Sequence, residues 1–239
     1  DSYWLAEPIE VLEANARFID SADRAPATAK PLWTGVQPER GGTLVTVYAK
    51  DQPGLFYRVA GAISLAGGNI IDARIHTTDD RMALDNFLIQ DARGAPFDDP
   101  HQLERLETLV TSAVQGEEPH MARLEAKALP LPRAGAFPIR PAVFIDNKAS
   151  NRYTVIEVNA RDRAALLSGL AQALSQSKTT IHSAHIATYG ERAVDVFYLT
   201  DLHGAKIERP ARLKTLRERL LKAADYEAEA GRAALSGGA

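Results

Sequence analysis

Five consecutive residues, Asp51, Gln52, Pro53, Gly54 and Leu55, combine types that could hold a small ligand. A residue before proline avoids the helical region and proline fits a first helical turn, so we expect a strand to stop and a helix to start here. Asp51 could cap the free N–H groups of that helix, and Gly54 could let a ligand approach the backbone. These N–H groups, at the positive helix end, attract a carboxylate such as that of an amino acid. The same residues also suit a capped helix start that binds nothing.

A second polar position, Asn69, follows two glycines just before the next expected strand. Its amide can offer both a donor and an acceptor to a polar ligand. Asparagine also tolerates the left-handed conformation of a turn, which would explain the residue without any ligand. The sequence leaves both interpretations of Asn69 open.

The elements that must position these residues occur twice in the chain. An offset of 111 residues aligns alternating strand positions and an i, i+4, i+8 helical stripe, which are the patterns of a strand and a helix with one buried face. One residue fewer in the second copy's hairpin turn then reduces the offset by one. The aligned pairs include Thr43 with Thr154, Val45 with Ile156, Val47 with Val158, Asp51 with Asp162, Leu55 with Leu166, Val59 with Leu170, Ile63 with Leu174, Asp85 with Asp195, and Phe87 with Phe197.

Each copy is predicted to contain a strand, a helix, two strands joined as a hairpin, and a second helix. One further strand would complete a ferredoxin-like βαββαβ unit, so the predicted fold class is α+β: two such domains in tandem, with antiparallel sheets and helices on one face. The closing strand of the first copy is left open, because residues 142–147 could pair with either copy. We expect an N-terminal helical segment and linker from a missing upstream domain (1–40), a first domain (41–116), a Pro-rich linker (117–141), a second domain (142–225) and a flexible tail (226–239).

The composition excludes several classes of protein. The 239 residues include no cysteine, which excludes disulfides and cysteine-based zinc sites and fits a cytoplasmic location. A net charge of -3 provides no general attraction to nucleic acid or anionic lipid. The longest apolar runs are far shorter than a membrane span. We therefore expect no nucleic acid and no membrane as partners.

The stretch "DQPGLFYRVAGAISLAGGNIIDARI", followed by "MALDNFLIQD", resembles an ACT domain, a ligand-sensing module of amino-acid-regulated enzymes. With "YWLAEP" near the start and the second copy "DNKASNRYTVIEVNARDRAALL" to "HIATYGERAVDVFYLTD", the chain is similar, more narrowly, to the C-terminal region of bacterial bifunctional uridylyltransferase/uridylyl-removing enzymes. That resemblance implies a glutamine sensor that reports to upstream catalytic domains acting on a PII signal protein in nitrogen control.

The chain itself is not expected to be an enzyme. The family's transferase site needs a Gly-Ser pair and its hydrolase site a His-Asp pair, and neither dipeptide occurs in the sequence. The resemblance therefore implies no cofactor for this chain, with L-glutamine as an allosteric ligand and Mg²⁺ only in the missing catalytic domains. A homodimer formed through an exposed sheet edge is left open.

The resemblance further implies two unequal ligand sites between the copies. One would combine residues 51–55 with Thr180 and Ile181, and the other would combine Asp162, Arg163 and the residues up to Leu166 with Asn69 and Ile70. The second copy has Ala164-Ala165 in place of Pro-Gly, and the Cβ of Ala165 would crowd the backbone. We therefore expect one good site, at the first copy's loop, and one weakened or lost.

The sequence also allows functions other than a glutamine sensor. An ACT-type module could bind a different amino acid, and a ferredoxin-like sheet could bind RNA by stacking bases on Phe87, Phe197 and Tyr198. His182 and His185 lie three apart on an expected strand, so they should point to opposite faces and not chelate a metal ion. Asp85 and Asp195 interrupt apolar strands, where they could be buried carboxylates with a raised pKa. Because no paired partner is in view, we expect them instead at an edge or hairpin position that faces water.

Overall fold

The computed structural model describes residues 7–25, 30–78, 80–118, 139–163, 165–189 and 191–225. The first half contains α2 (Ile9–Arg24), β1 (Leu32–Gln37), the 3-10 turn η1 (Pro38–Arg40), β2 (Gly42–Lys50), α3 (Leu55–Ala66), β3 (Asn69–Thr77), β4 (Met82–Gln90) and α4 (Pro100–Val114). The second half contains β5 (Ala142–Asp146), β6 (Thr154–Arg161), α6 (Leu166–Gln176), β7 (Thr179–Tyr189), β8 (Arg192–Asp201) and α7 (Pro210–Ala224). Most of the expected Pro-rich linker and the whole expected tail lie outside the described residues.

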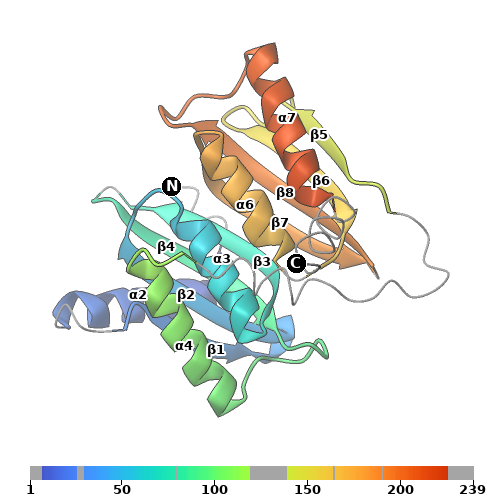
Figure 1. Ribbon diagram of the computed structural model, residues 1–239. Helices are drawn as coiled ribbons and strands as arrows, with labels where there is room; N and C mark the ends of the chain where they lie inside the picture. The colour runs from blue at the N-terminus through green and yellow to red at the C-terminus, as the bar shows by residue number, and fades with distance from the viewer. Residues whose placement is uncertain are drawn as a thin grey trace, which may run out of the picture.

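The eight strands form one antiparallel sheet in the order β1-β2-β4-β3-β7-β8-β6-β5 (Figure 1). Helices α3, α4, α6 and α7 cover one face of this sheet, whereas α2 lies against the opposite face of the first half (Figure 1). The expected ferredoxin-like arrangement, two antiparallel units with helices on one face, is thereby confirmed. The two units share a single sheet because β3 pairs with β7.

The additional strand of each unit comes before the unit's other strands and helices, and not after its second helix as expected. β1 pairs with β2, and β5 pairs with β6, so both units read strand, strand, helix, strand, strand, helix. This order corrects the expected βαββαβ sequence of elements and assigns residues 142–146 to the second unit. β1 lies ahead of residue 41, where we expected the first domain to begin, yet it forms an edge of that domain's sheet.

The buried core follows the periodicities seen in the sequence. Both helical stripes are at most 3% exposed: Leu55, Val59 and Ile63 in α3, and Leu166, Leu170 and Leu174 in α6. The aromatic rings of Phe56 and Phe87 stack with their centroids 5.6 Å apart. Phe87 and Phe197 are completely buried, so neither ring is available to stack on an RNA base.

A β-bulge interrupts β3 between Ile70 and Asp72, and a second one interrupts β7 at the aligned position, between Ile181 and Ser183. The bulge in β7 overturns the expectation that His182 and His185 face opposite sides, because an extra residue shifts the alternation of side chains. Both rings join one aromatic cluster, in which Tyr153 contacts His182 and Tyr198, and Tyr198 contacts His185.

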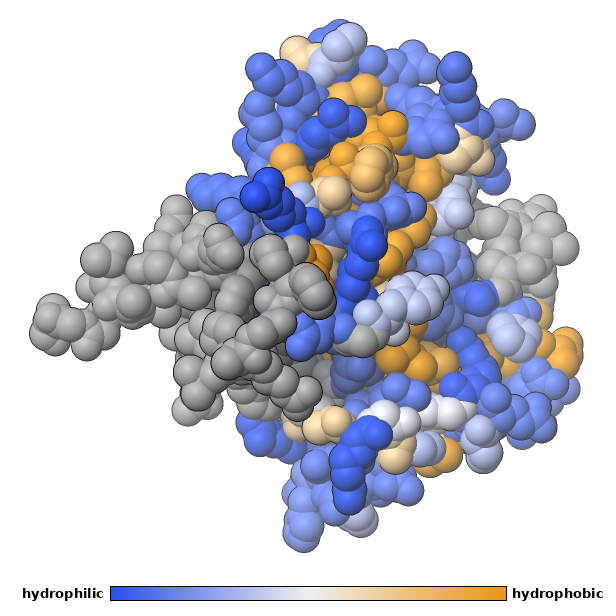
Figure 2. All heavy atoms as spheres, turned by 90° about the vertical axis from the view of Figure 1, so that its right-hand side faces the viewer, coloured by the Kyte–Doolittle hydropathy of each residue, from blue (hydrophilic) through white to orange (hydrophobic). Residues whose placement is uncertain are grey.

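The surface shown in Figure 2 is mainly hydrophilic, with apolar side chains visible in its upper half, which the second unit forms. The edge strand of that unit, β5, carries Phe144, which is 57% exposed. None of the helices in the described part of the chain has the length and apolar character needed to cross a membrane.

The two units also meet through their helices, where α3 packs against α6. The buried hydroxyl of Ser168 in α6 donates a hydrogen bond of 2.9 Å to the carbonyl oxygen of Tyr57 in α3. Tyr57 and Ser168 are aligned positions of the repeat, so this contact lies where the two copies of the same helix cross.

We expect Ser168→Ala to lower the free energy of unfolding by about 1 kcal/mol, because it removes one buried hydrogen bond between the units. Urea unfolding monitored by circular dichroism would measure the change. Thr108→Ala is the control, since the exposed Thr108 hydroxyl donates its hydrogen bond within its own helix, to the carbonyl oxygen of Glu104. An unchanged unfolding midpoint for Ser168→Ala would show that this contact does not stabilise the junction.

Candidate functional site at the junction of the two units

A cavity of about 310 Å³ lies between the two units. The first unit contributes Asn69 and Ile70 at the start of β3, together with the end of α3 and the turn after β4. The second unit contributes the loop between β6 and α6 and parts of β7 and β8. The lining residues are Ser64, Gly67, Gly68, Asn69, Ile70, Ala92, Asp162, Arg163, Ala165, Leu166, Leu167, Ile186, Thr188, Ala193 and Asp195.

The start of α6 opens at this cavity, where Leu166 and Leu167 line the wall. The first N–H groups of a helix have no acceptor within the helix, and they lie at its positive end. The adjoining loop is held in place by Arg163, which donates a hydrogen bond of 2.8 Å to the carbonyl oxygen of Ala223 in α7. This wall of the cavity is therefore suited to a carboxylate.

Two carboxyl groups of the second unit also line the cavity. Burial raises the pKa of Asp162, although a backbone hydrogen bond from Arg163 opposes the shift. Asp195, in the middle of β8, is only 1% exposed, and burial together with the nearby Asp162 raises its pKa to about 8. The expectation that Asp195 and its counterpart Asp85 face water was wrong, because both project from the helix-covered face of the sheet into the core.

The raised pKa of Asp195 predicts that folding stability falls as the pH rises from about 4 to about 8, since the folded protein holds a proton that the unfolded chain releases. Asp195→Asn should flatten this part of the profile, because its amide has no charged form. Chemical unfolding of both proteins at pH 5, 6, 7 and 8 would measure the difference. Parallel profiles would contradict the assignment of a neutral carboxyl to Asp195.

The loop of the first unit, residues 51–55, does not line this cavity. It is tied instead to the end of α4: Arg58, 5% exposed, donates hydrogen bonds of 3.0 Å to the carbonyl oxygens of Ala113 and Pro53. Gln52 adds a hydrogen bond of 2.6 Å to the carbonyl oxygen of Val114. Thr180 and Ile181, expected opposite this loop, lie at the start of β7 and do not line the cavity either.

Pro53 and Gly54 are the central residues of a turn that precedes α3. The N–H of Leu55 bonds to the carbonyl of Gln52, and Gly54 has a φ of 83°, as a type II turn requires at its third position. The helix begins at Leu55 and no side chain caps it, so the expected cap by Asp51 is not formed. The backbone conformation explains this glycine without a ligand.

The second unit has an alanine at the position of Gly54. Ala165 has a φ of 67°, and the N–H of Leu166 bonds to the carbonyl of Arg163. The methyl group of Ala165 is buried near Leu65 of the first unit and does not close the cavity, which it lines. The cavity therefore lies at the site that we expected to be the weaker of the two.

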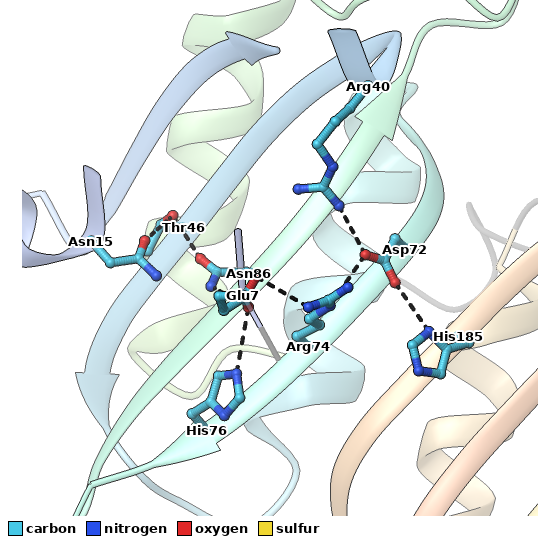
Figure 3. A network of polar contacts seen from close by, with 9 residues as sticks. All are labelled: Glu7, Asn15, Arg40, Thr46, Asp72, Arg74, His76, Asn86 and His185. Atoms are coloured by element: carbon cyan, nitrogen blue, oxygen red, sulfur yellow. Dashed lines mark hydrogen bonds and ion pairs between the residues drawn. The ribbon is translucent and has the colours of Figure 1, made fainter. Parts of the chain in front are cut away.

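A polar network on the opposite face of the sheet joins the segment before α2 to both units (Figure 3). Glu7, with its side chain 1% exposed, accepts a hydrogen bond of 2.9 Å from Asn86 and lies 3.5 Å from Arg74 and 3.4 Å from His76. Burial alone would raise the pKa of Glu7, but these three neighbours together lower it. No local sequence pattern indicates this buried glutamate, because the residues that surround it come from distant strands.

The same network continues through Asp72 to the second unit. Arg40 donates a hydrogen bond of 3.0 Å to Asp72, and Arg74 and His185 lie 3.5 and 3.6 Å from it. Burial opposes ionisation of Asp72, yet the hydrogen bond of His185 and the charges of Arg74 and Arg40 lower its pKa. β3 thus carries Asn69 at the cavity and, further along, the residues that contact Glu7 and His185 (Figure 3).

The described residues include no group of three or more His, Asp or Glu side chains that could hold a metal ion. His76, which the sequence places near Asp80, contacts Glu7. The hydroxyl of Thr78 donates a hydrogen bond to Asp80 within the hairpin turn.

Comparison with known proteins agrees with the duplicated fold. A model of the ACT domain matches residues 43–111, and a model of the ACR family N-terminal ACT domain matches residues 149–224. Between them, the two matches cover more than half of the chain.

Curated relatives match nearly the whole chain. It is 52% identical over 225 residues to the bifunctional uridylyltransferase/uridylyl-removing enzyme of Novosphingobium aromaticivorans and 52% identical over 224 residues to that of Erythrobacter litoralis, in both cases over 94% of this chain. The enzyme of Zymomonas mobilis is 47% identical, again over 94% of this chain. The chain spans only 24% of the length of each of these relatives. With both halves matched by ACT models and folded as ACT units, the chain belongs to the ACT-domain family and is a tandem pair of such domains.

Proposed function

We propose that this chain is the amino-acid-sensing regulatory region of a bifunctional uridylyltransferase/uridylyl-removing enzyme, and that glutamine is its ligand. The observation that supports this most is the cavity shared by the two ACT domains, which joins the start of α6 to the start of β3. A ligand held there contacts both domains, so it can favour one arrangement of the pair over another.

The chemistry of the cavity suits a small zwitterion. Backbone N–H groups at the start of α6 can bind a carboxylate, and the carboxyl groups of Asp162 and Asp195 can face a cation. Asn69, Ser64 and Thr188 add polar groups for a side chain such as an amide. The volume of about 310 Å³ lies at the small end of ligand pockets, which range from about 300 to 1,000 Å³. The similarity to the bifunctional enzymes favours glutamine among the amino acids.

Regulation requires that the ligand bind two arrangements of the protein with different affinity. β3 offers a physical connection, because it begins at the cavity with Asn69 and continues to Arg74, which contacts Glu7 of the segment leading towards the N-terminus. The catalytic domains and the PII signal protein would respond through that segment. A coupling free energy of about 1–3 kcal/mol is typical of such systems.

A thermal-shift screen with each of the twenty amino acids tests the proposal. At a hundredfold excess over its dissociation constant, a ligand of the folded state adds about 2.7 kcal/mol to the free energy of unfolding. We expect glutamine to give the largest shift and RNA oligomers to give none. A larger shift with another amino acid would reassign the ligand, and no shift with any amino acid would contradict the sensor.

A further inference from the structure

Asp195 stands out among the cavity residues because it is a buried acid in an apolar row. It lies between Ala193 and Phe197 on the helix-covered face of β8, with the three residues at most 2% exposed. Its Oδ1 atom is buried and has no hydrogen-bond partner among the described residues. An unsatisfied buried oxygen destabilises a folded protein, so its position at the cavity calls for a partner from outside the chain.

The charged groups that share the cavity wall with Asp195 are Asp162 and Arg163. Asp162 raises the pKa of Asp195 and thus opposes its ionisation. The guanidinium of Arg163 donates to the carbonyl oxygen of Ala223. The neighbours of Asp195 on the adjacent strands, Val158 and Ile186, are apolar. In the ligand-free protein, burial and the nearby Asp162 therefore favour the neutral form of the Asp195 carboxyl at pH 7.

The repeat provides an internal comparison. Asp85, the counterpart of Asp195 in β4, is equally buried, and its Oδ1 atom likewise has no partner in the described part of the chain. Burial also raises the pKa of Asp85, with Asp51 adding to the shift. Asp85 does not line the cavity, so it can serve as a control that shares the burial of Asp195 but not its access to a ligand.

We propose that Asp195 binds the ammonium group of the ligand, and that binding displaces a proton from its carboxyl to solvent. The inference rests on the proposed amino-acid site. The ligand enters with its ammonium group charged, Asp195 changes from a neutral acid to a carboxylate, and an ion pair forms beside Asp162. The second ACT domain thereby recognises both charged ends of the ligand, with the carboxylate at the start of α6.

The proposal makes glutamine binding dependent on pH. Below the pKa of Asp195 in the ligand-free protein, each unit of rising pH should strengthen apparent binding by up to about tenfold, because less free energy is needed to remove the proton. The site would also reject a ligand without the ammonium group, since such a ligand leaves the buried acid without a partner.

Isothermal titration calorimetry of the whole chain with glutamine, at pH 7 in phosphate and in imidazole, counts the protons exchanged on binding. We expect the release of roughly one proton per ligand. Asp195→Asn should bind glutamine about tenfold or more weakly, with heats that no longer depend on the buffer. Asp85→Asn should keep both the affinity and the proton release of the original protein.

A second ligand distinguishes a direct contact between Asp195 and the ammonium group from an indirect effect of the substitution on the structure. The deaminated analogue of glutamine should bind much more weakly than glutamine to the original protein, and Asp195→Asn should remove most of that discrimination. Glutamine binding without proton release, or full discrimination by Asp195→Asn, would overturn the role of Asp195 while leaving the sensor intact. No binding of glutamine to the original protein would overturn the proposed function itself.

Discussion

Replacing Ala92 with tryptophan should weaken glutamine binding by about tenfold or more, or by at least about 1.4 kcal/mol. Ala92 is exposed, lies in the turn after β4 and lines the cavity. An indole at this position would occupy the mouth of the cavity without disturbing the buried core. The effect would appear as a raised dissociation constant in calorimetry, with the unfolding midpoint of the free protein unchanged.

The repeat provides a matched control for this substitution. Leu202 is the counterpart of Ala92, exposed in the turn after β8 and absent from the cavity. Asp91 and Asp201 close the two turns in the same way, by accepting backbone hydrogen bonds of 2.9 Å from Ala95 and Ala205. Leu202→Trp should therefore leave binding unchanged. The reverse outcome, with binding lost in Leu202→Trp and kept in Ala92→Trp, would place the ligand at the loop of the first unit.

Glu7→Ala should lower the free energy of unfolding by about 1.5–3 kcal/mol, the usual range for buried hydrogen bonds to a charged group. The substitution removes the acceptor of Asn86 and one of the two carboxylates beside Arg74, which keeps Asp72. Because Glu7 precedes α2, the loss should also loosen that helix from the sheet. Chemical unfolding at pH 7 would measure the first effect, and amide hydrogen exchange in α2 would measure the second.

Glu13→Ala is the control for this change, because Glu13 is 64% exposed and pairs with Arg17 on the same helix. Its effect should stay below about 0.5 kcal/mol. The pKa of Glu7 is lowered in the folded protein, so its stabilisation is complete only at pH values above the ordinary glutamate pKa of 4.5, and it disappears as the pH falls through the lower folded-state pKa. The difference between Glu7→Ala and the original protein should shrink accordingly in acid. Equal effects of the two substitutions at pH 7 would contradict the role of the network.

The repeat and its core could be predicted from the sequence because their signal is local and periodic. The stripe in α3, the alternation in β2 and the matching stripe in α6 each follow from burial of one face. The positions of the additional strands, β1 and β5, could not be predicted from periodicity. A strand before β2 and one after α4 fill the same edge of the sheet, and periodicity does not choose between them.

The candidate site was predicted only in part. Asn69, Ile70, Asp162 and Arg163 do come together around one cavity. The Asp-Gln-Pro-Gly motif predicted a ligand site at residues 51–55 of the first unit. In the structure, Gly54 instead forms a turn there, and Arg58 ties that turn to α4. Arg58 aligns with Gly169 in the second unit. Arg163 there bonds to α7, and the aligned residue in the first unit is Gln52. Which residue ties each loop to its helix depends on contacts with helices distant in the sequence, and no local pattern reveals such contacts.

The central claim is that a small zwitterion binds where the start of α6 meets the start of β3. Amide chemical shifts in a ¹⁵N-labelled sample titrated with glutamine test it most directly. The predicted result is a set of saturable changes concentrated at Asn69, Ile70, Arg163, Leu166 and Leu167. Changes confined to residues 51–55 and to Thr180 and Ile181, or no saturable change at any concentration, would contradict it.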